Sequence, residues 1–424
     1  MSTPYIPCLD LGNYINGNEE QRKQFSDDLG RAFNDSGFVT ITNHGLSQEL
    51  IDKLYENIKA AFSLPVELKR KYEKPELAGQ RGYTSAGKET AKGAKTADLK
   101  EFWQIGNEVT DGDPIKNEYP DNEVLEELPD FNSVTREIYT KLEENGKHLL
   151  RAIATYLELP VDYFDKHVHN GNSILRGIHY FPIEDPDALP DDAVRAGAHE
   201  DINLITLLIG ASADGLEVLT RSNEWLPIKA AHTDIVVNVG DMLQRLTNNK
   251  LKSTTHRVVN PPRELWGTSR YSIPFFMHPV SGMSLNALEN CVDENNPKLY
   301  EDTTAGEFLH ERLIDFAVQI INITDNVKST KAGNHLSGQI VRSGTAPSLN
   351  YSEAQSAESR NDFIHKMSVV LKELRETHSN LKIILRAKLF LGQEIEIDKA
   401  IKENDELISI FVKSIETSRN KISK

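Results

Sequence analysis

The stretch AHEDINLITLLIG, Ala198 to Gly210, begins with an imidazole and two carboxylates and then becomes almost wholly apolar. In a β-strand, alternate side chains point to the same face, so His199 and Asp201 project together while Glu200 points away. The apolar run that follows is typical of a buried strand. We therefore expect two potential metal ligands on one side of a β segment.

A His-x-Asp spacing alone is weak evidence for a metal site, because a chain with 13 histidines shows this spacing by chance. A third ligand is needed to support the site. Residues 232–234, with the sequence HTD, are a second copy of the spacing. The stretch 253–276 is strand-like and offers His256, followed by Arg270 and Ser272. We expect His256 to complete the set.

Short β-like runs follow one another from Ile174 to Pro279, separated by Pro, Gly, Asp and Asn. Seven or eight such strands predict a sandwich or a barrel. A ligand site in such a fold lies in its open mouth. Upstream, residues 20–60 are expected to form helix, strand and helix, and residues 134–156 a helix.

Residues 80–125 have no clear period, which predicts a long irregular segment. The polar loop at residues 88–100 either covers the substrate or is simply solvated. Phe102 and Trp103 are expected in the core. In the stretch that follows residue 237, Asn238 is interpreted as a turn former.

Helical periodicity begins after Thr304 and continues to the end of the chain. Four helices are expected, at roughly residues 307–327, 333–357, 360–390 and 394–422. Because the connections between these helices are short, the sequence predicts an antiparallel four-helix bundle.

Composition sets the broad class. A chain of 424 residues suggests two domains. No apolar run approaches a membrane span, and the N-terminus lacks the features of a secretory signal, so a cytoplasmic location is expected. Two cysteines, Cys8 and Cys291, exclude a disulfide framework or a Cys-based zinc site. The net charge of −16 argues against general nucleic-acid binding.

The residue types of the expected ligand set, His199, Asp201 and His256, favour one kind of metal centre. Two imidazoles and one carboxylate leave three adjacent coordination positions open, which suits non-haem Fe(II) and O₂. Arg270 offers a fork of donors that can hold a carboxylate, and Ser272 adds a hydroxyl on the same strand face. A metal beside a carboxylate anchor is what a 2-oxoacid cosubstrate needs.

Five motifs occur in order along the chain: GFVTITNHG, His199-x-Asp201, VVNVGDMLQRLTNNKLKSTTHRV, Arg270-x-Ser272 and TTAGEFL. Over about residues 5–312 they resemble the isopenicillin N synthase-like branch of the 2-oxoglutarate/Fe(II)-dependent dioxygenases. The resemblance implies an α+β fold, a double-stranded β-helix (jelly roll) with flanking N-terminal helices.

The resemblance also implies roles for single residues. His199, Asp201 and His256 would be the catalytic Fe(II) ligands. Arg270 and Ser272 would bind the distal carboxylate of 2-oxoglutarate, and Tyr180 would lie near this cosubstrate. The family commonly has Thr at the position of Glu200, which is expected to face away from the metal.

Two other histidines are not expected to bind metal. His232 falls in a linker where the family has a Pro-Gly turn, so residues 232–234 are interpreted as a chance copy of the spacing. His44, in the turn Asn43-His44-Gly45, is interpreted as structural.

The last part of the chain, about residues 311–422, resembles the small four-helix-bundle proteins of 23S rRNA intervening sequences, whose members tend to self-associate. The expected domains are therefore 1–310 and 311–424. Within the first, a helical part covers about 1–170 and the jelly-roll core about 171–282. The bundle is expected to mediate homo-oligomerisation and to carry no chemistry.

The predicted function is that of an oxidoreductase, an Fe(II)- and 2-oxoglutarate-dependent oxygenase. It would use O₂ to oxidise a small molecule, with hydroxylation as the favoured outcome, and release succinate and CO₂. Two alternatives stay open: an Fe(II)/O₂ oxidase or cyclase that does not use 2-oxoglutarate, and a non-catalytic oligomeric scaffold in which the bundle is the active part. No membrane partner is expected.

Overall fold

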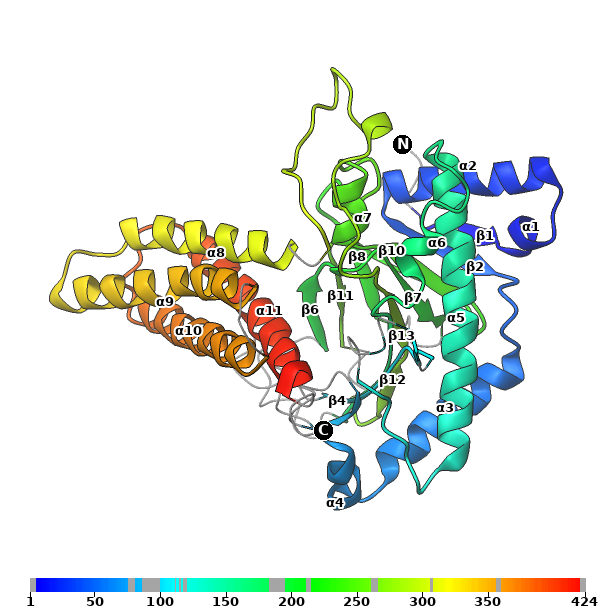
Figure 1. The fold of residues 1–424 in the computed structure, drawn as a ribbon, viewed down its shortest axis with the longest axis horizontal. Helices are drawn as coiled ribbons and strands as arrows, with labels where there is room; N and C mark the ends of the chain where they lie inside the picture. Colours follow the sequence, from blue (N-terminus) through cyan, green and yellow to red (C-terminus); the bar gives the residue numbers. More distant parts are fainter. Residues whose placement is uncertain are drawn as a thin grey trace. The chain divides into compact units, whose positions relative to one another are not determined.

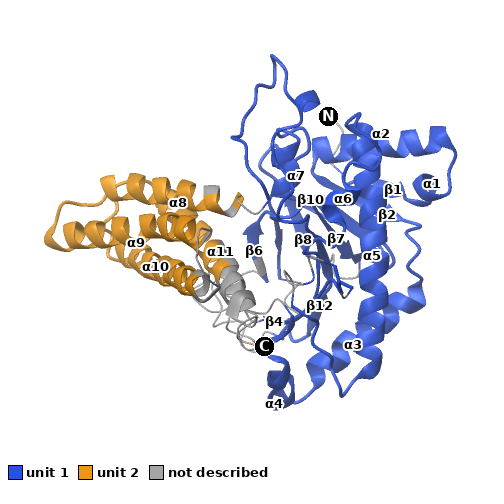
Figure 2. Cartoon of the chain, viewed as in Figure 1, with its two compact units in different colours: residues 1–73, 81–87, 99–306 blue, residues 74–80, 88–98, 307–424 orange. Residues whose placement is uncertain are grey.

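The computed structural model describes residues 5–74, 81–85, 100–110, 112–113, 116, 120–182, 195–210, 215–260, 266–305, 308–355 and 360–419 (Figure 1). The chain divides into two compact units: residues 1–73, 81–87 and 99–306 belong to the first, and residues 74–80, 88–98 and 307–424 to the second (Figure 2). Within the described residues, no helix is both long and apolar enough to cross a membrane.

The N-terminal helices begin where the sequence supplies caps. Helix α2 (Glu19–Asp35) starts at Asn18, which forms a reciprocal capping box with Gln21. Helix α3 (Gln48–Ser63) starts at Ser47, whose hydroxyl accepts from the backbone N–H of Leu50. Strand β2 (Phe38–Thr42) lies between them, as the sequence predicts.

Two sheets form the core of the first unit. The larger has the order β1-β2-β10-β7-β13-β5-β4-β3, with β12 also paired to β5, and the smaller has the order β6-β11-β8-β9. The strands of the larger sheet are β1 (Cys8–Asp10), β2, β3 (Gly82–Thr84), β4 (Lys100–Gly106), β5 (Ile174–Tyr180), β7 (Ile205–Ile209), β10 (Ile235–Val239), β12 (Arg270–Ser272) and β13 (Pro274–Met277). Those of the smaller are β6 (Ala196–His199), β8 (Leu216–Leu219), β9 (Trp225–Pro227) and β11 (His256–Val258).

The two sheets pack face to face. One cluster of buried residues combines Phe38 and Val236 of the larger sheet with Leu216, Val218 and Val258 of the smaller. Shared burial of both inner faces is the defining feature of a β-sandwich.

Strand register identifies the inner face of the larger sheet. Directly paired residues share a face, and the pairs run from Phe38 to Asn238, to Thr206, to Phe276 and to Ile174. Phe38 belongs to the cluster between the sheets, so this whole row faces the smaller sheet. Along β5, the residues that alternate with Ile174 point the same way.

The outer face of the larger sheet is covered by α5 (Pro129–Tyr156), which packs against β7 and β13. The ring of Tyr139 meets Phe275 edge to face, with 5.1 Å between centroids. A Cβ on Gly146 would lie 2.3 Å from Sδ of Met277, so a larger residue here would have to displace the Met277 side chain.

The expectation of a long irregular segment at residues 80–125 is wrong in part. Strands β3 and β4 lie within it and extend the larger sheet beyond β5. Phe102 and Trp103 are buried, one on each face of β4. A strand buried on both faces shows no alternation of apolar and polar residues, which is why periodicity missed it. Residues 86–99, which include most of the loop considered as a substrate cover, lie outside the described residues.

A buried ionic network links α4 (Val66–Lys69) to β3 and β4. Lys69 Nζ lies 2.7 Å from Glu101 Oε2, and the Tyr83 hydroxyl donates to the same carboxylate. His179 Nδ1 lies 2.8 Å from Glu101 Oε1. Burial acts to raise the pKa of Glu101, but its bonds to His179, Lys69 and Tyr83 outweigh burial and lower that pKa.

We expect Glu101→Gln to lower the free energy of unfolding by about 3–5 kcal/mol, because it leaves the Lys69 ammonium buried without a counter-ion. Urea denaturation measures this change. The double variant Glu101→Gln/Lys69→Met removes both charges and is expected to recover a large part of the loss. A single variant as stable as wild type would contradict the proposed role of the network.

The described part of the second unit contains four helices: α8 (Phe308–Asp325), α9 (Lys331–Gln355), α10 (Arg360–Arg386) and α11 (Glu394–Arg419). Each packs on the next, and α11 packs on α8. Their common core includes Ile320, Ile340, Leu374 and Phe411. Arg312 of α8 forms two hydrogen bonds to Glu403 of α11, at 2.9 and 2.8 Å. Helical periodicity predicted these elements because every helix buries a single apolar stripe.

Candidate metal and cosubstrate site

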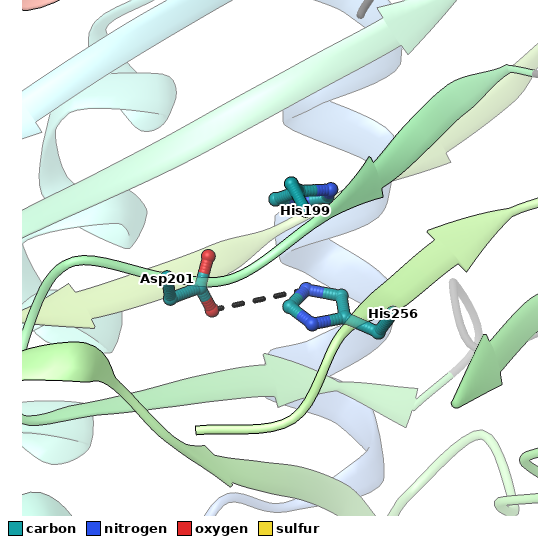
Figure 3. Close-up of side chains that lie close together, drawn as sticks. All are labelled: His199, Asp201 and His256. Carbon is teal, nitrogen blue, oxygen red and sulfur yellow. Dashed lines mark ion pairs between the residues drawn. The ribbon is translucent and has the colours of Figure 1, made fainter. Parts of the chain in front are cut away.

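His199, Asp201 and His256 converge between the two sheets (Figure 3). Their potential ligand atoms all lie within 4.8 Å of one another. Strands β6 and β11 pair His199 directly with His256, and the two ring centroids are 4.4 Å apart. Asp201 lies just beyond the end of β6, with Oδ2 3.9 Å from Nε2 of His256. The three side chains expected to bind metal are therefore brought together.

Backbone carbonyls set the tautomers of both histidines. Nδ1 of His199 lies 2.8 Å from the carbonyl of Gly197, and Nδ1 of His256 lies 3.1 Å from that of Thr254. A carbonyl only accepts, so Nδ1 carries the proton in each ring and Nε2 carries the lone pair. This arrangement orients imidazole ligands in metal sites.

The Asp201 carboxylate is held by the larger sheet. Its Oδ2 accepts from the Thr206 hydroxyl at 2.6 Å and from the Asn238 amide at 2.8 Å. Burial acts to raise the pKa of Asp201, but His256, His199 and these two hydrogen bonds outweigh burial and lower that pKa. The group is therefore a carboxylate, as metal ligation requires.

Asn238 corrects one interpretation of the sequence. It lies in β10 and is buried with its amide on Asp201, so it is not a turn former. A polar residue inside the apolar run IVVNV is the signal that could have identified it.

Arg270, Ser272 and Tyr180 come together at the other end of the inner face. Strand β12 pairs with β5, which places Arg270 opposite Tyr180 and Ser272 opposite Ile178. The Arg270 guanidinium lies over the Tyr180 ring, 5.1 Å from its centroid. Through β5 and β13 they share a sheet face with Thr206, which bonds Asp201. The candidate carboxylate anchor and metal ligands thus face the same interior.

A second guanidinium lies near this anchor and was missed from the sequence. Nη2 of Arg195 donates to the carbonyl of Thr268 at 3.2 Å. Burial, and then the charge of Arg270, lower the pKa of Arg195. Two neighbouring cations create a positive potential that attracts a dicarboxylate.

The side chains not expected to bind metal have other partners. His232 lies against Asp52, with Nε2 2.8 Å from Oδ1. Nε2 of buried His44 lies 2.6 Å from the carbonyl of Thr233. Glu200 accepts a hydrogen bond from Thr255.

The residues present fit an Fe(II) centre. They supply two imidazole nitrogens and one carboxylate oxygen from one side, the donor set that leaves adjacent positions open. The orienting bonds to Gly197, Thr254, Thr206 and Asn238 are of the kind that surround metal ligands. Such a centre, beside an arginine anchor, can activate O₂ next to a bound oxoacid.

Comparisons with known proteins agree with this chemistry. Residues 171–279 match the 2OG-Fe(II) oxygenase superfamily, and residues 6–127 match the N-terminal region described as "non-haem dioxygenase in morphine synthesis N-terminal". Residues 309–413 match the 23S rRNA-intervening sequence protein family.

Individual proteins are similar over most of their length. The proline hydroxylase buaE of Petromyces alliaceus is 34% identical, over 73% of this chain and 98% of that protein. A 2OG-Fe(II) oxygenase family protein of Caulobacter crescentus has 44% identity and a TM-score of 0.67, over 74% of this chain and 99% of that one. A full-length Neurospora crassa protein, solved in complex with alpha-KG, has 29% identity and a TM-score of 0.63, over 73% of this chain and 96% of that one.

Proposed function

The chain belongs to the 2OG-Fe(II) oxygenase superfamily and is a jelly-roll 2-oxoglutarate-dependent dioxygenase; from that premise we propose that it hydroxylates a small molecule at a centre held by His199, Asp201 and His256. Its cofactors are Fe(II), 2-oxoglutarate and O₂. The observation that carries the proposed site is the convergence of the three ligand atoms within 4.8 Å. The name of the buaE relative supports hydroxylation.

Iron and 2-oxoglutarate, when bound, would supply oxygen activation, and the products would be succinate, CO₂ and a substrate that has gained one oxygen atom. The residues of the chain bind and orient. Arg270 would hold the distal carboxylate of 2-oxoglutarate through charge-assisted bonds, and Ser272 would add a hydroxyl donor. Tyr180 packs against the Arg270 guanidinium and fixes its direction. Asn238 and Thr206 hold the Asp201 carboxylate.

Incubation of anaerobically purified protein with Fe(II), 2-oxoglutarate and a metabolite pool, followed by controlled addition of O₂, tests the function. We expect succinate to form only with Fe(II), and one pool member to gain an oxygen atom, both followed by mass spectrometry. Substrate oxidation without 2-oxoglutarate would favour the oxidase alternative. Absence of any iron-dependent product would favour the scaffold alternative.

The proposed division into residues 1–310 and 311–424 assigns chemistry to the first domain and self-association to the second. An exposed apolar stripe on α8 supports self-association: Ile314, Val318 and Ile321 are 38%, 51% and 42% exposed. Their spacing places them on one helix face. Exposed apolar patches of this kind mark interaction sites.

The cytoplasmic location, and the absence of nucleic-acid partners, stay predictions.

We expect Val318→Glu to lower the oligomeric mass measured by light scattering, because a carboxylate in an apolar interface is strongly unfavourable. Succinate formation should persist, since no ligand residue changes. Leu349→Glu on α9, where Leu349 is 65% exposed, is the matched control and should keep the wild-type mass. A monomeric wild-type protein would contradict this proposal.

A further inference from the structure

Arg176 is a second guanidinium, besides that of Arg270, on the inner face of the larger sheet. It is the one residue of β5 that is not buried. Its Nε donates to Oε1 of Gln104 on β4 at 2.9 Å, and Gln104 is itself buried. This bond uses Nε and not the edge formed by the two Nη groups, which can hold a carboxylate at two points.

Two aromatic rings flank this guanidinium. Its Cζ lies 4.5 Å from the ring centroid of Phe102 on β4 and 5.5 Å from that of Phe276 on β13. Phe276 is the one residue of β13 that is not buried. Cation–π contact with both rings holds the charged group in place and gives it an apolar surround.

Strand register places Arg176 on β5 two residues from Ile174, which pairs with Phe276, and four residues from Tyr180 at the cosubstrate anchor. Phe276 pairs with Thr206, whose hydroxyl bonds Asp201. The anchor residue Arg270 pairs instead with Tyr180, four residues further along β5, or about 13 Å at the usual rise of a strand. Arg176 is therefore available for a ligand other than 2-oxoglutarate.

The charge of Arg176 is not balanced within the described part of the chain, where no carboxylate forms an ion pair with it. The residues that surround it on the inner face are Gln104, Phe102, Phe276, Ile174 and Ile178, none of them acidic. A half-buried cation among apolar groups is unfavourable until an anion pairs with it.

We propose that Arg176 binds the carboxylate of the primary substrate. The substrates are then small carboxylic acids, and the apolar body of each packs on Phe102 and Phe276. Gln104 is a positioning residue that turns the guanidinium edge toward this carboxylate. The inference rests on the proposed function, since it names the substrate class of the same site.

The test compares wild type with Arg176→Met, which keeps an unbranched apolar stem but removes the charged guanidinium, and with Arg176→Lys. Arg136→Met is the matched control, because Arg136 is an exposed residue of α5 whose partner is Glu108 at 2.7 Å. The probes are amino acids, aromatic acids and short fatty acids, each beside its own carboxamide. Two quantities are measured: stimulation of succinate formation, and binding by anaerobic calorimetry with Fe(II) and 2-oxoglutarate present.

We expect at least one acid to bind wild type and Arg136→Met about 10- to 100-fold more tightly than its carboxamide, the range of a charged hydrogen bond. Arg176→Met should remove this preference and Arg176→Lys should restore part of it, while the affinity for 2-oxoglutarate changes little. Equal binding of acids and carboxamides by wild type, or an intact preference in Arg176→Met, would overturn the inference. Failure of wild type to bind 2-oxoglutarate would instead contradict the proposed function.

Discussion

Replacement of His256 by alanine is expected to abolish 2-oxoglutarate turnover and iron binding together, and His199→Ala and Asp201→Ala are expected to do the same. Each change removes one of three protein donors from a site where they lie within 4.8 Å of one another. With two donors left, both the affinity and the geometry of Fe(II) are lost. Iron content per chain and succinate formation measure the two effects.

His232→Ala is the matched control for the ligand variants. His232 belongs to the second copy of the spacing, and its ring lies against Asp52. We expect this variant to keep its iron and its turnover. Iron loss in His232→Ala with retention in His199→Ala would overturn the assignment of the metal site.

Arg270→Ala is expected to weaken 2-oxoglutarate binding while iron binding remains. Loss of a partly buried, charge-assisted contact to a carboxylate costs about 2–5 kcal/mol, or roughly 30-fold to several thousand-fold in affinity. The residue contacts Tyr180 and lies on β12, apart from the three metal ligands, so the iron site should stay intact. Anaerobic calorimetry with 2-oxoglutarate and a parallel measurement of iron content separate the two effects.

Arg136→Met controls for the loss of a guanidinium elsewhere, and it should bind 2-oxoglutarate as wild type does. Unchanged 2-oxoglutarate affinity in Arg270→Ala would show that the anchor lies elsewhere, with Arg195 the next residue to test because its charge lies near that of Arg270.

Two parts of the candidate site could be predicted from the sequence because each is short and local. His199 and Asp201 are two residues apart, and Arg270 and Ser272 share a face of one strand. Spacings of this kind depend only on the period of a β segment. The structure adds one detail: β6 ends at His199, so Asp201 is held by Thr206 and Asn238 and not by strand alternation.

The sequence by itself determined the succession of short strands, the helices capped by Asn18 and Ser47, and the helices after residue 307, because hydrophobic period and end caps are local properties of the chain. Only the tertiary structure decided which distant residues meet. Strand β4 joins β5 and brings Gln104 to Arg176, and β10 brings Asn238 to Asp201. Such contacts follow from strand order and register, which are set by the packing of the whole sheet against α5 and the smaller sheet, and no local period encodes them.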